Sequence, residues 1–148
     1  MQRKVIANDV LIPEIARLVK KGEKVKFVPK GTSMLPFIRG GKDSVVLQWA
    51  DSFREGDIVL AKIGAIFVLH RIVGIDGDSV ILMGDGNLVG TEKCLKSDIM
   101  AVAAKIVRNG REIDCHSRKH LAMAWMWKKM MPARRYLLAV YKRIIIVK

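Results

Sequence analysis

The chain has 148 residues, of which 51% are hydrophobic and 28% are charged. This length and apolar content predict a folded domain with a core of its own and exclude a disordered chain. The two cysteines, Cys94 and Cys115, are too few for a disulfide framework and lack the paired spacing of a zinc site. We therefore predict neither a metal nor a cofactor.

The formal net charge of +13 is concentrated at the C-terminus. Residues 116–148 contain nine Lys and Arg and no Asp or Glu, which leaves +4 for residues 1–115. The nine cations are Arg118, Lys119, Lys128, Lys129, Arg134, Arg135, Lys142, Arg143 and Lys148. Such a segment suits an anionic surface, either lipid headgroups or nucleic acid. We divide the chain into a domain of residues 1–115 and a basic tail of residues 116–148.

The sequence shows no signal for secretion or for crossing a membrane. Charged residues from Glu14 onward interrupt the N-terminal segment, so we predict no secretory signal peptide. The longest uncharged apolar runs, such as residues 63–69 and 121–127, fall short of the roughly 20 residues that a spanning helix requires. These features predict a cytoplasmic or peripheral membrane protein.

The predicted elements begin with a helix over about residues 9–21, which Asn8 or Asp9 can cap and Gly22 ends. Short β-branched runs separated by glycines follow over about residues 23–110 and predict a compact β body with a hairpin turn at residues 75–79. These runs are residues 25–28, 44–49, 57–63, 66–73, 79–83 and 100–107. The tail returns to helical spacing and is interrupted at Pro132. The fold class predicted is mainly β, with a short N-terminal helix and a basic, helical C-terminal tail.

The segment of residues 29–36 places Ser33 on a constrained turn before Pro36. Such a turn can present a hydroxyl nucleophile, and backbone N–H groups there can face a developing oxyanion. From these residues alone, a polar turn without chemistry is an equal interpretation.

A serine hydroxyl needs a base to act as a nucleophile. Among the three histidines, only His70 lies in a predicted strand of the β body, because His116 and His120 belong to the basic tail. His70 is therefore the candidate base, with a structural histidine as the alternative interpretation and Lys62 as the competing base.

Four segments resemble, in order, motifs of the signal peptidase I and LexA-type serine peptidase superfamily, over about residues 22–107. They are Gly31-Thr32-Ser33-Met34-Leu35-Pro36, Gly56-Asp57-Ile58-Val59, Val68-Leu69-His70-Arg71-Ile72-Val73 and Met83-Gly84-Asp85-Gly86-Asn87. The third segment is similar to the His-Arg motif of the archaeal and endoplasmic-reticulum signal peptidases. Histidine stands where the bacterial enzymes have lysine, so the resemblance implies a signal-peptidase-like β domain with a Ser–His site.

The implied chemistry is acyl transfer, with Ser33 as the nucleophile and His70 as the general base. The resemblance gives Asp85 the role of orienting His70, although Asp85 can instead simply cap a glycine-rich turn. It also implies that the backbone N–H of Ser33 contributes to the oxyanion hole. The implied substrate contacts are Gly31, Thr32, Met34 and Pro36.

We therefore expect a serine endopeptidase that cleaves a peptide or a leader-like substrate at a membrane surface. The N-terminal membrane anchor of the family is not seen, which keeps a catalytically inactive peptide-binding module of the same fold as the alternative. A self-cleaving LexA-like regulator is disfavoured because no Ala or Cys precedes a Gly. We expect the tail to bind a membrane surface or a partner. Packing of the tail on the β body is the second interpretation. Nucleic acid comes last, because no nucleic-acid-binding motif is recognised.

Overall fold

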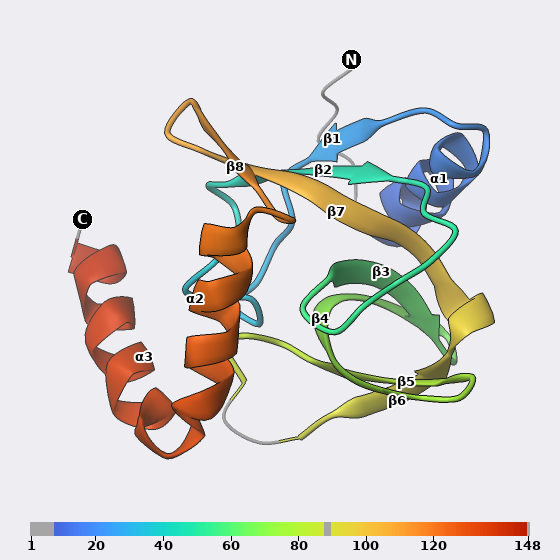
Figure 1. Ribbon diagram of the computed structural model, residues 1–148. Helices are drawn as coiled ribbons and strands as arrows, with labels where there is room; N and C mark the ends of the chain where they lie inside the picture. The colour runs from blue at the N-terminus through green and yellow to red at the C-terminus, as the bar shows by residue number, and fades with distance from the viewer. Residues whose placement is uncertain (1–7, 88–89, 148) are drawn as a thin grey trace.

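The computed structural model describes residues 8–87 and 90–147 of the chain (Figure 1). Residues 1–7 of the predicted domain and Lys148 of the basic tail lie outside the described residues. One curled antiparallel sheet forms the body, with a short helix from the N-terminal part and two helices from the C-terminal part beside it. The predicted fold class, a mainly β body between terminal helices, is confirmed.

The sheet contains eight strands: β1 (Val25–Phe27), β2 (Ser44–Gln48), β3 (Ile58–Ile63), β4 (Ile66–Asp76), β5 (Ser79–Met83), β6 (Glu92–Leu95), β7 (Ile99–Arg108) and β8 (Arg111–Asp114). The helices are α1 (Asn8–Lys20), the short 3-10 turn η1 (Lys96–Asp98), α2 (Arg118–Lys129) and α3 (Met131–Val147). The predicted hairpin turn at residues 75–79 joins β4 to β5, where Asp76 pairs with Ser79.

The strands follow the order β1-β2-β7-β3-β4-β5-β6, and β8 pairs with β7. Irregular register interrupts the pairing of β2 with β7, of β3 with β7 and of β4 with β5. Such irregularities bend a strand and increase its local twist. The sheet therefore curls, so that β5 and β6 close over β3 and β4 (Figure 1).

Strand β3 is buried on both faces, which explains its unbroken apolar run. Ile58 and Leu60 belong to the core cluster that also contains Ile15 of α1. Val59 and Ala61 belong to a second cluster, enclosed within the curl of the sheet. Successive side chains of a strand alternate between its faces, so β3 is a wall shared by both cores. It thereby fixes the position of β4, which carries His70.

The tail folds into two helices that lie side by side, with α3 on the side of α2 away from the sheet (Figure 1). Ser117 caps α2 by accepting a hydrogen bond from the backbone N–H of His120 (3.1 Å). Buried side chains hold α2 to the body, as shown by His120 and Ala124 at 4% and 5% exposure. The helices separate at Met130, and Pro132 falls in the first turn of α3, where proline is tolerated.

Within residues 8–87 and 90–147, no helix combines the length and the apolar character that spanning a bilayer requires.

The burial of His120 predicts a dependence of stability on pH. Burial and the nearby Arg71 cation lower the pKa of His120 from 6.5 to about 4. Between these values the unfolded state binds a proton that the folded state does not bind. The free energy of unfolding should therefore fall by about 1.4 kcal/mol per pH unit as the pH drops from 6.5 toward about 4.

Urea unfolding of the native chain and of His120→Gln between pH ~7 and ~5 measures this effect. Carboxyl groups contribute equally in both proteins. The difference between the two slopes of the free energy of unfolding against pH therefore isolates the contribution of His120. Parallel slopes would contradict the prediction.

Candidate active site

Ser33 lies in the loop between β1 and β2, and the turn of residues 83–87 holds that loop in place. The backbone N–H of Gly86 donates to the carbonyl oxygen of Ser33 at 2.8 Å. A Cβ atom on Gly84 would lie 2.3 Å from the carbonyl oxygen of Ser33, and one on Gly86 would lie 2.3 Å from that of Thr32. Only glycine allows this approach, so the two glycines of the 83–87 turn position the serine loop.

His70 lies on β4 opposite Val59 of β3, and it is only 8% exposed. Its Nδ1 contacts Oε1 of Glu92, the first residue of β6. An ionised carboxylate only accepts hydrogen bonds, so this contact places a proton on Nδ1. In the neutral ring the lone pair is then on Nε2, the nitrogen that a general base uses toward a serine.

Ser33 and His70 line the same cavity, which has a volume of about 200 Å³. Apolar residues of its lining include Ile12, Phe27, Met34, Ile38, Leu60 and Leu69, while Lys30, Ser33 and His70 make part of it polar. Among the described contacts, no direct hydrogen bond joins the Ser33 hydroxyl to the His70 imidazole. Such bonds are often long without substrate and tighten when it binds, so the shared cavity is the relevant geometry.

The expected contact between Asp85 and His70 is corrected by the structure. Both carboxylate oxygens of Asp85 accept from Arg71, Oδ1 from Nε and Oδ2 from Nη2, each at 2.8 Å. Arg71 follows His70 in β4, so their side chains leave the strand on opposite faces. The carboxylate bound to Arg71 is therefore separated from His70 by the strand, and Glu92 is the acid beside His70.

Arg71 is a buried connection between several segments. It is 4% exposed, and its Nη1 donates to the carbonyl oxygen of Gly56 at 2.8 Å. Its guanidinium carbon lies 4.9 Å from the ring centroid of Phe37. Together with the ion pair to Asp85, these contacts join β4 to the 83–87 turn, to the start of β3 and to the loop after Ser33.

Two residues of the candidate site, Arg71 and Glu92, were not predicted as site residues from the sequence. An arginine inside the apolar run of residues 66–73 is itself a signal, because a buried cation requires a partner. Glu92 stands in a short polar segment after the 83–87 turn. The registers put Glu92 in line with Leu82 and Ile72, so Glu92 lies on the same face of the sheet as His70, which is two positions before Ile72.

The four predicted substrate contacts divide into two groups. Gly31 and Met34 line the cavity with Ser33. Thr32 is exposed and its carbonyl packs against Gly86, whereas Pro36 lines a different hollow, beside α2.

The competing base Lys62 is not among the described residues that line the cavity, although its cross-strand neighbour Phe67 is. Lys62 is exposed on β3, with its Nζ 5.7 Å from the ring centroid of Phe67. Another lysine, Lys30, is exposed and lines the cavity three positions before Ser33. Lys30 is therefore the lysine that a functional test of the base has to include.

Both cysteines are free and buried. Burial raises the pKa of Cys115 to about 12 and also raises that of Cys94. The thiolate is the reactive form, so neither cysteine competes with Ser33 as a nucleophile. Across the described ranges, no three His, Cys, Asp or Glu side chains come together as a metal site.

The comparisons with known proteins add no family. No protein-family model matches the chain, and no curated protein matches it. The resemblance to the signal peptidases therefore stays a prediction from the four motifs.

The Arg71–Asp85 pair predicts a large loss of stability when one partner is removed. Asp85→Ala leaves a buried guanidinium uncompensated, which should lower the free energy of unfolding by about 3–5 kcal/mol. The double variant Arg71→Met with Asp85→Leu should recover most of this loss, because it removes both charges.

Denaturant unfolding measures both effects, with Glu112→Ala as the matched control. Glu112 pairs with Lys105 at 2.8 Å, but both side chains are about half exposed. Loss of such a surface pair costs roughly 0–1 kcal/mol. An Asp85→Ala cost no larger than that of Glu112→Ala would show that the buried pair does not hold the fold.

Proposed function

We propose that this protein is a serine endopeptidase in which Ser33 is the nucleophile, His70 the general base and Glu92 the carboxylate that orients His70. One observation carries the proposal. Ser33 and His70 line one cavity, while Glu92 binds Nδ1 of His70 and leaves Nε2 as the basic nitrogen.

The reaction follows the acyl-transfer sequence. Nε2 of His70 takes the hydroxyl proton as Oγ of Ser33 bonds to the scissile carbonyl carbon. The imidazolium then gives that proton to the leaving amine, and the C–N bond breaks. Water, deprotonated by the same nitrogen, hydrolyses the acyl ester and restores the serine. Glu92 stabilises the imidazolium in both halves of the reaction.

The backbone around Ser33 supports an oxyanion site. Within the described residues, the N–H of Ser33 has no hydrogen-bond acceptor, while its carbonyl is held by Gly86. The N–H of Ser33 shares a peptide group with the carbonyl of Thr32, which accepts from the N–H of Leu35 at 3.2 Å. This hydrogen bond orients the peptide group and leaves the donor available. A donor fixed before the reaction stabilises developing negative charge without reorganisation.

The cavity favours an extended peptide over a small metabolite. Its volume of about 200 Å³ lies below the roughly 300–1,000 Å³ of small-molecule sites. The apolar residues of its lining suit one apolar side chain of the substrate. Strand β1 is at one end of the sheet order, and Phe27 at its end lines the cavity. A peptide can therefore add along this edge, with main-chain hydrogen bonds giving affinity.

Acylation of Ser33 tests the proposal without knowledge of the substrate. A serine-directed fluorophosphonate probe should modify the native chain at Ser33, with the site located by peptide mass spectrometry. Ser33→Ala should abolish the modification, whereas Ser52→Ala, at an exposed serine of the β2–β3 connection, should leave it unchanged. Folded protein that the probe never modifies would contradict a serine peptidase and favour the peptide-binding module.

The rate of this acylation distinguishes the candidate bases. His70→Ala should slow it about 10²–10⁴-fold, the usual contribution of a general base. Glu92→Gln should slow it in the same direction, because it loses the ion pair that fixes the imidazole. Lys62→Ala and Lys30→Ala should acylate at the native rate. Loss of reaction in a lysine variant, with His70→Ala unaffected, would replace the Ser–His assignment by a Ser–Lys one.

A further inference from the structure

We propose that the outer face of α3 docks on an anionic lipid bilayer, a function that goes beyond peptide cleavage and does not depend on it. The docking face is the exposed apolar set of Tyr136, Leu137, Val140 and Ile144. These side chains are 72%, 39%, 58% and 50% exposed, respectively. Large apolar side chains so exposed on one helix indicate a surface that another apolar phase covers.

The spacing of these residues makes them one stripe. Leu137, Val140 and Ile144 are three and four positions apart, so they share one side of the helix, with Tyr136 at its margin. Leu138, which is 3% exposed, lies on the other side. An amphipathic helix normally turns its apolar stripe to the core, whereas α3 turns this stripe to solvent.

Packing on the β body does not account for the stripe. A hollow of about 760 Å³, lined by both tail helices and the body, contains Met123, Met126 and Tyr141 in its wall. The hollow lies between the helices and the body, and none of the four residues of the docking face lines it. The stripe is therefore available to a partner outside the chain.

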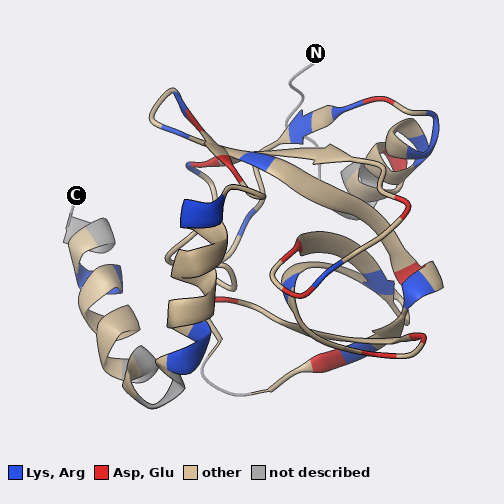
Figure 2. Ribbon diagram, viewed as in Figure 1, with Lys and Arg blue, Asp and Glu red and all other residues tan. Residues whose placement is uncertain are grey.

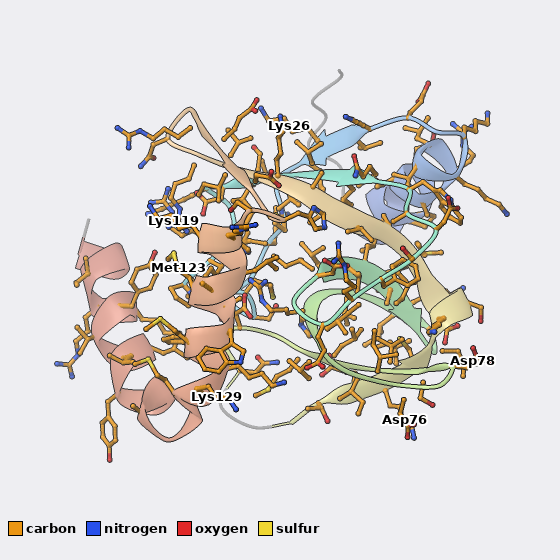
Figure 3. All side chains as sticks on the ribbon, viewed as in Figure 1. Lys26, Asp76, Asp78, Lys119, Met123 and Lys129 are labelled. Carbon is orange, nitrogen blue, oxygen red and sulfur yellow. The ribbon has the colours of Figure 1, made fainter. Side chains whose placement is uncertain are left out.

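The charge around the stripe identifies the partner as anionic. Residues 116–148 carry nine cations and no acid, and Figure 2 shows no red segment on α2 or α3. Lys129 and Arg143 are both exposed: Arg143 precedes Ile144 in α3, and Lys129 is in the last turn of α2, with its Nζ 5.4 Å from the Trp125 ring centroid. Asp76 and Asp78 lie on the far side of the body from the helix pair (Figure 3). The helix pair is therefore cationic.

An apolar stripe with cations but no acids is the pattern of an interfacial helix. Apolar side chains enter the boundary between headgroups and acyl chains, while Lys and Arg bind anionic headgroups. Nucleic acid would satisfy the charges but leave the stripe in water. A second copy would bury the stripe but oppose two basic tails. A bilayer rich in anionic lipid satisfies both features.

Docking would also fix the distance from the bilayer to the candidate active site. Nε1 of Trp127 in α2 donates to the backbone carbonyl of Asp85 at 2.6 Å. The helix pair is thus joined to the 83–87 turn, which positions Ser33. A peptide at the membrane surface would meet the Ser33 cavity at a set height.

Co-sedimentation of the full chain with vesicles tests the proposal. Vesicles of equimolar phosphatidylglycerol and phosphatidylcholine should bind the protein, and vesicles of phosphatidylcholine alone should bind it at least about tenfold more weakly. Added salt should release it, since charges are screened over about 8 Å at physiological ionic strength. Equal binding to both compositions, or tighter binding to duplex DNA than to anionic vesicles, would overturn the proposal.

Matched variants assign the binding to α3. Ile144→Ser should weaken vesicle binding at least about threefold, because an isoleucine side chain leaves the apolar phase. Ile66→Ser is the control, since Ile66 is 60% exposed and lies at the β3–β4 hairpin. Lys129→Glu with Arg143→Glu should weaken binding about tenfold or more, and Lys20→Glu with Lys21→Glu on the α1 side should change it little.

Circular dichroism and the fluorophosphonate reaction at Ser33 establish that each variant is folded. Loss of vesicle binding with unchanged acylation would support docking as a separate property of α3. Vesicle binding that falls equally in the Ile144 and Ile66 variants would overturn the assignment to α3. Failure of acylation in the native chain, with vesicle binding intact, would overturn the peptidase and leave docking in place.

Discussion

The buried ion pair between Arg71 and Asp85 is the constraint on which the candidate site depends. Two charges removed from water stabilise a fold only when the ion pair has good geometry and the remaining polar atoms find hydrogen-bond partners. Here both carboxylate oxygens of Asp85 accept from the Arg71 guanidinium. The pair ties β4 to the 83–87 turn. Since β4 carries His70 and the turn carries Gly86, which holds Ser33, one interaction couples His70 to Ser33.

The alternation of a β-strand separates the roles of the two acids. His70 and Arg71 are neighbours in β4, so they face opposite sides of the sheet. Each has a carboxylate partner on its own side, Glu92 for the histidine and Asp85 for the arginine. In this account Asp85 maintains the structure and Glu92 serves the proposed chemistry. A sequence motif that contains an acid therefore does not determine which side chain that acid contacts.

Much of the fold could be predicted from the sequence because its strands are β-branched runs bounded by glycines, and the first helix and the basic tail have clear helical spacing. Strands β6 and β8 were missed, since Glu92–Leu95 and Arg111–Asp114 are short, charged and without alternation. The Ser33 turn and His70 were found from local motifs. Their partners could not be found in this way, because the contact between His70 and Glu92 depends on two strand registers.

The assignment of His70 as a base held by Glu92 can be measured directly from its imidazole nitrogens. Long-range proton–nitrogen NMR of the ¹⁵N-labelled chain, in the neutral form of His70, reports which nitrogen carries the proton. The account predicts a proton on Nδ1 in the native chain and a mixture of tautomers in Glu92→Gln. Asp85→Asn, if it remains folded, should keep the native tautomer. A proton on Nε2 in the native chain would contradict the account, because that nitrogen could not accept the proton of Ser33.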